Sequence, residues 1–180
     1  MAIWNIDPAH SAADFTVRHM MVTNVRGGFD VIDGQINFDP ENAADSSVEV
    51  TIDVSSINTG VADRDGHLRS ADFFDVENYP TLTFKSTEVN LTGDDTANVI
   101  GDLTIRDVTR SVVLQVEFLG SGQSPFGDTR AGFEGTANIN REDFGLTWNQ
   151  ALETGGVLVG KDIKISLDVQ GILVTEAQEA

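Results

Sequence analysis

The stretch SSVEVTIDVSS, residues 46–56, carries the pattern that decides the fold. Valine or isoleucine occupies its even positions from 48 to 54, whereas Glu49, Thr51 and Asp53 occupy the odd positions between them. Side chains of a β-strand alternate between two faces, so this spacing indicates one buried face and one face in water. The stretch therefore predicts a strand whose even positions point into a core.

The same alternation recurs through most of the chain. A change of register near Ser86–Glu88 indicates a β-bulge in one of the segments. Turn-forming residues separate most of the segments, as in GSGQSPFGD and ETGG. The eight predicted strands are 11–19, 25–38, 46–56, 81–91, 97–106, 111–120, 129–139 and 161–173.

Residues 59–80, TGVADRDGHLRSADFFDVENYP, interrupt this pattern. They lack alternation and predict one or two short helices that cross between strands and end before Pro80. Residues 19–25, HMMVTNV, are compatible with a single turn of helix. The length of 180 residues suits one domain over 1–180, and about the last six residues, TEAQEA, are expected to be frayed.

Eight one-sided strands joined mainly by short turns predict an all-β protein with an antiparallel sheet. A sheet of this size with one apolar face either folds into a sandwich or closes into a barrel. An eight-stranded barrel is just filled by its own side chains, or it holds one small apolar ligand. The choice between a filled and a hollow interior is therefore a choice about function.

Glycines on the predicted inner faces bear on that choice. Gly27 shares a face with Val25, Phe29 and Val31, and Gly101 and Gly135 lie on the inner faces of other strands. Such glycines either mark bends where a closing sheet coils or leave room for a guest. The pattern alone leaves both readings open.

Composition excludes several classes of function. The formal net charge is −18, from 29 acidic and 11 basic residues, which disfavours binding to nucleic acid and to anionic membranes. The chain has no cysteine, so disulfides and thiolate chemistry are absent. No signal peptide or membrane-spanning run is visible at the start or elsewhere, and we expect a cytoplasmic protein unless a leader has been removed.

The sequence offers no matched set of catalytic groups. His10, His19 and His67 lie in different predicted elements, and no HExxH or G-x-S-x-G motif occurs. The glycine-rich TGGVLVG (154–160) precedes a strand and lacks the spacing of a phosphate-binding loop. We therefore predict no catalytic residues, no metal site, no cofactor and no enzymatic activity.

Six stretches of the sequence match the pattern of a known family: WNIDPAHS (4–11), FTVRH (15–19), VRGGF (25–29), DRDGHLRSADFFDVENYPTLTF (63–84), GDLTIRDVTRSV (101–112) and NREDFGL (140–146). Together they resemble the YceI-like family of lipid-binding, lipocalin-like proteins. At the turn after Ile105–Arg106 the family usually has glycine, and this chain has Asp107, which tolerates a left-handed backbone moderately well. We expect that hairpin to form nonetheless.

The resemblance implies an eight-stranded antiparallel lipocalin-like barrel with a short helical crossover over about residues 60–78. It also implies an elongated apolar pore that holds a polyisoprenoid or similar long-chain amphiphile for carriage or storage, and a homodimer. The residues expected to contact the ligand are Phe15, Val17, His19, Gly27, Phe29, Val50, Ile52, Phe84, Leu103, Leu114, Val116, Phe133, Arg141, Ile165 and Leu167. Of these, His19 and Arg141, together with Arg18, are the candidates for a polar head.

Two other hypotheses compete with lipid binding. An enzyme acting on an isoprenoid lipid would need a polar pair with perturbed ionisation deep in the pore. An interaction protein with a filled barrel would instead work through its acidic surface. The chain length of the ligand, its head group, the pathway and the dimer surface are not encoded in any motif that we find.

Overall fold

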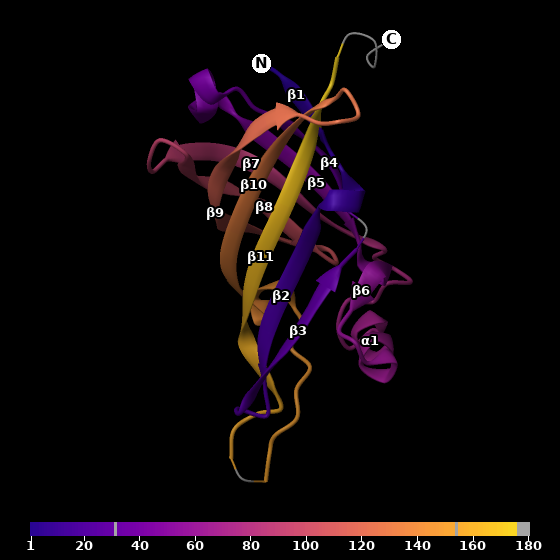
Figure 1. The fold of residues 1–180 in the computed structure, drawn as a ribbon. Coiled ribbons are helices and arrows are strands. Elements are labelled where there is room, and N and C mark those ends of the chain that lie inside the picture. Colours follow the sequence, from indigo (N-terminus) through magenta and orange to yellow (C-terminus); the bar gives the residue numbers. More distant parts are fainter. Residues whose placement is uncertain (31, 154, 176–180) are drawn as a thin grey trace.

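The computed structural model describes residues 1–30, 32–153 and 155–175. Within these ranges the chain forms eleven strands, one α-helix and four short 3₁₀-helices around a hollow core (Figure 1). The strands are β1 Ile3–Ile6, β2 Ala12–His19, β3 Thr23–Phe29, β4 Ile32–Asn37, β5 Ser47–Asp53, β6 Ile57–Asn58, β7 Thr81–Leu91, β8 Thr96–Ile105, β9 Val108–Gln123, β10 Thr129–Asn140 and β11 Val159–Leu173. The helices are α1 Ala62–Arg69, η1 Pro8–His10, η2 Pro40–Asp45, η3 Val54–Ser56 and η4 Arg141–Phe144.

Eight of these strands form a closed ring, which confirms the predicted antiparallel barrel. The ring runs β1-β4-β5-β7-β8-β9-β10-β11 and closes where β1 pairs with β11. Closure leaves no free edge along the ring, so the backbone groups of these strands are paired on both sides. The long strands β9, β10 and β11 form one tall wall of the barrel (Figure 1).

The strand β1 was not predicted, and it lies along β11 together with β2, which is the first predicted strand. The strand β11 pairs with β1 at its C-terminal end, over Gly171–Leu173, and with β2 lower down, over Val159–Asp168. The 3₁₀-helix η1 separates β1 from β2, so the two pieces act as one long, bent strand. The bend lets the lower barrel splay outward into the extension β2-β3-β6.

The prediction of one continuous strand over 25–38 was wrong. The strand breaks after Phe29, and Asp30 is a bend. Phe29 is buried before the break, and Ile32 and Ile36 are buried after it, so the inward face changes from odd to even positions. Val31, which the pattern placed on the inner face, lies outside the described residues. The break follows from pairing, because β3 pairs with β2 and β6 whereas β4 pairs with β1 and β5.

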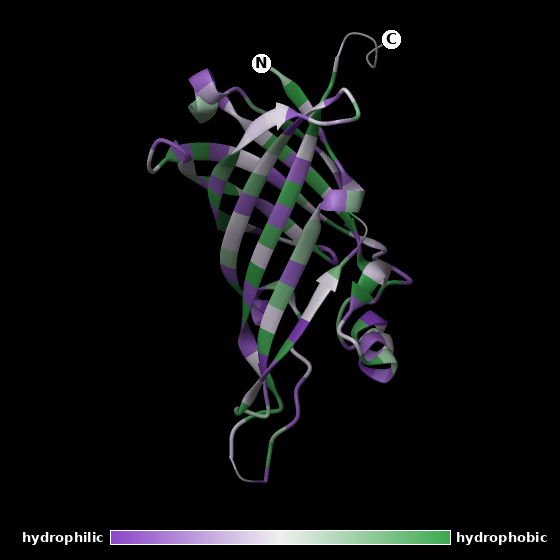
Figure 2. Ribbon diagram, viewed as in Figure 1, coloured by the Kyte–Doolittle hydropathy of each residue, from purple (hydrophilic) through white to green (hydrophobic). Residues whose placement is uncertain are grey.

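Other sequence expectations are confirmed. In β5 and η3, Val54 and Ile52 are buried while Glu49 and Thr51 are exposed. The register between β7 and β8 shifts between Ser86 and Glu88, as the pattern predicted. Alternation is plain along the strands of the barrel wall (Figure 2).

The hairpin at the family's usual glycine also forms. Ile105 pairs with Val108, and the turn between them is Arg106–Asp107. The positive backbone angle falls on Arg106, at φ 57°, and not on Asp107. The substitution at 107 is therefore compatible with the turn.

The crossover between β6 and β7 contains a single helix, α1, followed by turns (Figure 1). Its aromatic residue Phe73 is buried against the barrel, and Phe74 packs edge-on against Phe29 at 5.9 Å. Arg106 donates from Nη1 to the Phe73 carbonyl at 3.3 Å and lies over the Tyr79 ring. The crossover thus covers the side of the barrel between β6 and β7, which do not pair with each other.

The expectation of a helical turn over 19–25 was wrong. Met20–Val22 form the turn of the β2–β3 hairpin, and both Met20 and Met21 have positive φ, at 53° and 65°. The Val22 amide donates to the His19 carbonyl at 3.2 Å, which closes the turn. Two left-handed residues in succession are typical of the type I′ turn that suits the twist of a hairpin.

Two of the three inward glycines, Gly27 and Gly101, are covered by rings from neighbouring strands, whereas Gly135 lines the barrel cavity. A Cβ on Gly27 would lie 2.7 Å from the Phe15 ring, and a Cβ on Gly101 would lie 2.5 Å from the Phe84 ring. A glycine under an aromatic ring is a recognised means of packing a coiled sheet. The space at these two positions is therefore filled by aromatic rings, and the hollow of the barrel lies elsewhere.

Candidate ligand-binding channel

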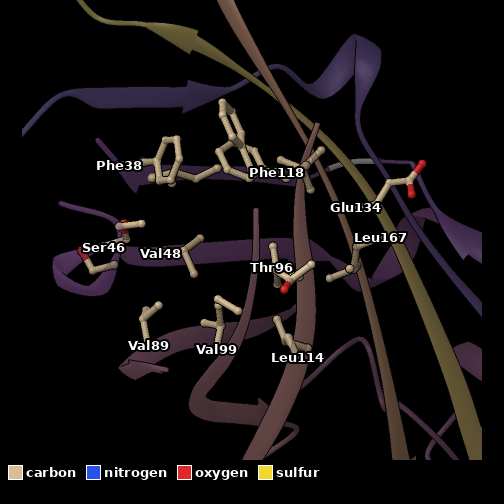
Figure 3. Close-up of a pocket in the computed structure, with 18 of the residues that line it drawn as sticks. Phe38, Ser46, Val48, Val89, Thr96, Val99, Leu114, Phe118, Glu134 and Leu167 are labelled. Carbon is tan, nitrogen blue, oxygen red and sulfur yellow. The ribbon is translucent and has the colours of Figure 1, made fainter. Parts of the chain in front are cut away.

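The interior of the barrel contains an upper chamber of about 210 Å³ at the end formed by η2 and the β7–β8 turn. Figure 3 shows the side chains that line it, with Phe38 and Phe118 on one side and Val89, Val99 and Leu114 on another. The Phe38 and Phe118 rings lie 4.8 Å apart, and both also contact the Phe133 ring. This wall is apolar and partly aromatic.

A lower chamber of about 200 Å³ occupies the other half of the barrel, toward η4 and the crossover. Its lining comes from nearly every strand and from the crossover residues Leu68, Phe73 and Phe74. The residues at its floor are buried, including Phe73 at 6% exposure and Leu146 at 4%. Almost all of its lining side chains are hydrocarbon.

The two chambers share one band of wall. Each is larger than the engineered cavity of about 150 Å³ that stays dry and binds benzene. Because the same side chains line the end of one chamber and the beginning of the next, the two chambers lie end to end along the barrel, and the pair is called the channel. The shared residues are Ile6, Val50, Phe84, Leu114, Leu167 and Val169.

Polar groups gather at the upper end of the channel. Asp94, Asp95 and Thr96 of the β7–β8 turn line the chamber and are exposed, so this end is a mouth. Ser46, from the end of η2, also lines it, and its Oγ is buried without a hydrogen-bond partner. An unpaired buried hydroxyl is costly, so this oxygen is a ready partner for a polar group of a ligand.

Arg141 closes the lower end in a different way. It is only 3% exposed, and its guanidinium donates to four backbone carbonyls: Gly160 at 2.8 Å, Leu146 at 2.6 Å, Trp148 at 3.0 Å and Val159 at 3.2 Å. Burial lowers the pKa of Arg141 from its ordinary value. These bonds tie the segment after η4 to the start of β11 and occupy most of the side chain's donors.

The predicted apolar contacts assemble around the channel. Phe15, Val17, Phe29, Val50, Ile52, Phe84, Leu103, Leu114, Val116, Phe133, Ile165 and Leu167 all line one chamber or both. Arg141 also lines the lower chamber. The geometry brings these residues together, and their contact with a ligand stays a prediction.

Three other candidates lie away from the channel lining. Gly27 lies beneath the Phe15 ring, as described above. His19 ends β2, where it pairs with Thr23 and Val159, and Arg18 is exposed. Neither of these side chains is among those that line the chambers, so a role for them in holding a head group also stays a prediction.

Sequence reasoning missed several lining residues. Phe38 ends the predicted strand 25–38, in step with Ile32 and Ile36, but was not among the predicted contacts, and Phe73 and Phe74 lie in a crossover that carries no strand pattern. Phe118 alternates in step with Leu114 and Val116 in the predicted strand 111–120, so that pattern could have identified it. Ser46 precedes a strand and gives no signal by itself.

Two of the histidines hydrogen-bond to nearby carboxylates, and the His67 ring also packs edge-on against the Trp148 ring at 4.6 Å. His10 Nδ1 lies 2.7 Å from Asp7 Oδ2, and His67 Nε2 lies 2.9 Å from Asp72 Oδ2. The hydrogen bond with His10, followed by those with Arg130 and Ala9, lowers the pKa of Asp7 below its ordinary value, against burial, which raises it. In the part of the chain that the structure describes, no three His, Asp or Glu side chains are grouped as a metal site would require.

The family follows from comparison with known proteins. The family model described as a YceI-like domain matches residues 4–171. The chain belongs to the YceI-like family. A UPF0312 protein of Vibrio cholerae is 45% identical over 138 residues, covering 77% of this chain and 73% of its own length. A UPF0312 protein of Staphylococcus aureus is 39% identical over 171 residues, covering 94% and 97%.

Solved structures share the barrel. BcnA of Burkholderia cenocepacia superposes with a TM-score of 0.81 at 27% identity, covering 92% of this chain and 98% of its own. The YceI protein of Campylobacter jejuni gives 0.75 at 30% identity, covering 88% and 90%. A polyisoprenoid binding domain from Saccharophagus degradans gives 0.71 at 16% identity, covering 95% and 98%, which supports the fold alone. Among the described residues, no helix is long and apolar enough to cross a membrane.

Proposed function

We propose that this protein binds one long-chain amphiphilic lipid, with a polyisoprenoid favoured, along the channel of its barrel. The observation that carries the proposal is the pair of apolar chambers, about 210 and 200 Å³, joined by a shared wall. A lipid chain that occupied both chambers would leave water for a hydrocarbon surrounding along its whole length. Burial of apolar surface contributes about 0.8 kcal/mol per methylene before ordering costs.

The asymmetry of the channel supports one orientation of the lipid. The lower chamber offers hydrocarbon walls and an arginine whose guanidinium is engaged by carbonyls, so it suits the tail. The upper mouth offers the unpartnered Ser46 hydroxyl next to Asp94 and Asp95, so it suits the head. Because carboxylates repel phosphate, an uncharged head with a hydroxyl or carbonyl fits this mouth better than a phosphorylated one.

Binding in the service of carriage or storage, not catalysis, is the role that we infer. The YceI-like family of the chain and the polyisoprenoid-binding description of a structural neighbour support lipid binding as the general activity. The homodimer and the cytoplasmic location remain predictions from the sequence, to be tested by sedimentation and by fractionation of the native host.

Organic extraction followed by mass spectrometry tests the proposal. Protein purified without added lipid is expected to release a long-chain amphiphile in about equimolar amount. Leu167→Trp places an indole in the wall that both chambers share and should abolish the signal. The matched control is Ser166→Trp, whose side chain points outward from the neighbouring position of β11 and should leave the signal unchanged. Protein from several hosts that always extracts empty, and that does not take up geranylgeraniol, would rule the proposal out.

A further inference from the structure

The turn of the β2–β3 hairpin carries apolar side chains where a turn usually carries polar ones. Met20, Met21 and Val22 are 47%, 56% and 73% exposed, one after another. The positive φ of both methionines favours Asn and Gly at these positions, because a side chain crowds the backbone there. A local rule broken in this manner is expected at functional sites more often than elsewhere.

The tip is fixed to the body of the protein. The Met20 amide donates to the Leu158 carbonyl at 2.7 Å, so the turn is held against the start of β11. Met21 lies over Gly156, where a Cβ would come within 3.0 Å of its side chain. The tip is therefore a supported part of the lower end of the barrel, and part of the segment between η4 and β11 extends past it (Figure 1).

Cations without partners flank the tip. Thr16 pairs with Lys164 on one side and with Arg26 on the other, so Lys164 and Arg26 lie in one row across β11, β2 and β3. Arg18 follows two residues along β2. All three side chains are exposed, and none makes an ion pair within the described residues.

The lower end is electrically different from the rest of the surface. Its four exposed cations stand beside four acids of the adjoining elements and Asp14 of β2, whereas the whole chain has 29 acidic and 11 basic residues. An anionic surface would therefore repel every other face more strongly than this one. The cations are Arg18, Arg26, Lys161 and Lys164, and the acids are Glu142, Asp143, Glu153 and Asp162.

We infer that this tip, Met20–Val22 with its flanking cations, docks the protein on a phospholipid bilayer. The apolar side chains would enter the boundary between head groups and acyl chains, and the cations would meet lipid phosphates. Three side chains on a turn fall far short of the 20–30 residues that each partner contributes to a stable protein dimer, so a second copy fits poorly. The docking goes beyond the proposed function: it sets the closed lower end of the channel, lined by Val17, beside the membrane and leaves the mouth at the opposite end in water.

The opposite end of the barrel provides a control. Phe126, in the β9–β10 turn, is 85% exposed, more than any residue of the tip. It stands alone, however, and the nearby cation Arg130 is already paired with Asp7 at 2.7 Å and Asp128 at 3.0 Å. A single exposed apolar residue on a protein surface is ordinary.

The test is flotation with vesicles of phosphatidylcholine containing about one-fifth phosphatidylglycerol. The wild-type protein and Phe126→Ser should float together with the vesicles. The double variant Met20→Asn, Met21→Gly installs the residues that the turn favours, so its thermal midpoint should stay or rise while vesicle binding falls about tenfold. The charge reversal Arg26→Glu should also weaken vesicle binding, and the loss should be larger at low salt than at high salt.

Three outcomes would overturn the docking: a wild-type protein that does not float, a double variant that floats as well as wild type, or a tip-dependent dimer in sedimentation. Uptake of geranylgeraniol in solution, read by native mass spectrometry, is measured on the same variants and should not depend on the tip. Failure of that uptake would refute the proposed function without affecting vesicle docking, so the two claims can be refuted independently.

Discussion

The two chambers of the barrel are almost equal in volume and unlike in every other respect. The upper chamber ends in exposed Asp94 and Asp95 and an unpaired serine hydroxyl, whereas the lower one ends in buried Phe73 and Leu146. One end of the channel is a mouth and the other is a floor. The difference teaches that a barrel of near-uniform strands can still impose a direction on its guest.

The floor is expected to be the more sensitive region, and Arg141→Met should give the largest effect. The change removes four hydrogen bonds from a buried guanidinium to backbone carbonyls, and we expect a loss of about 3–5 kcal/mol in the free energy of unfolding, measured by urea denaturation. The control Arg110→Met removes an exposed arginine that bonds only to the Thr109 carbonyl, and should cost about 0.5 kcal/mol or less. Equal losses of stability in the two variants would show that the floor is no more sensitive than the exposed surface.

Truncation of an aromatic side chain should have the next largest effect, and the effect should differ between the two chambers. Phe73 is buried between the His67 and Trp148 rings, at 5.2 and 5.5 Å, and Phe73→Ala should cost about 3 kcal/mol and speed the release of bound lipid. Phe118→Ala, in the half-buried upper wall, should cost about half as much and leave release nearly unchanged. Calorimetry and stopped-flow release of a fluorescent prenol measure the two quantities. Faster release from Phe118→Ala than from Phe73→Ala would mean that the lower end is not the closed one.

A pair of neighbouring serines sharpens the assignment of the mouth. Ser46→Ala removes an unpartnered Oγ and should leave the free energy of unfolding within about 0.5 kcal/mol, while weakening geranylgeraniol binding several-fold. Ser47 accepts a hydrogen bond from Asn37 at 2.9 Å, so Ser47→Ala should cost about 1 kcal/mol of stability and spare binding. Isothermal titration of both variants with the prenol is the measurement. Unchanged binding by Ser46→Ala would place the head elsewhere.

The smallest expected effect concerns the acid on the lower wall. Burial, and then repulsion by Asp168 and Asp30, raises the pKa of Asp14 above its ordinary value of 3.8. A carboxyl whose folded pKa is raised destabilises the fold while it is ionised; this penalty shrinks as the pH falls through the raised folded pKa and is gone below the ordinary value of 3.8. Asp14→Asn should therefore gain up to about 0.5 kcal/mol at pH 7, since solvent screens this exposed group, and nothing near pH 3. A gain that persists at pH 3 would point to packing and not to charge.

Alternation carried most of the prediction of the fold and of the channel wall. The inward face of 46–56 and the bulge at 86–88 depend on local pattern, and the structure has both. The break inside 25–38 depends on which partner strands each half meets, and a single strand's alternation holds no record of its partners. Strand pattern likewise gave no access to Phe73 and Phe74, because the crossover places them by tertiary packing.

Gly27 shows where sequence reasoning reached its limit. The pattern left two interpretations of Gly27, a bend in the sheet or an empty space beside it. The structure instead places the Phe15 ring over Gly27, and the two residues are paired across β2 and β3. Gly27→Leu should accordingly cost stability, since backbone and ring atoms both lie within 3.0 Å of an added Cβ. The channel depends on residues farther along the same wall.

The central claim is that one lipid lies along both chambers. Crystals of protein purified without added lipid, refined with the barrel interior left empty, test it most directly. The account predicts continuous tubular density from Ser46 at the mouth, past Leu114 and Leu167, to Phe73 at the floor. Separate water peaks, or side chains collapsed into a sealed interior, would contradict it.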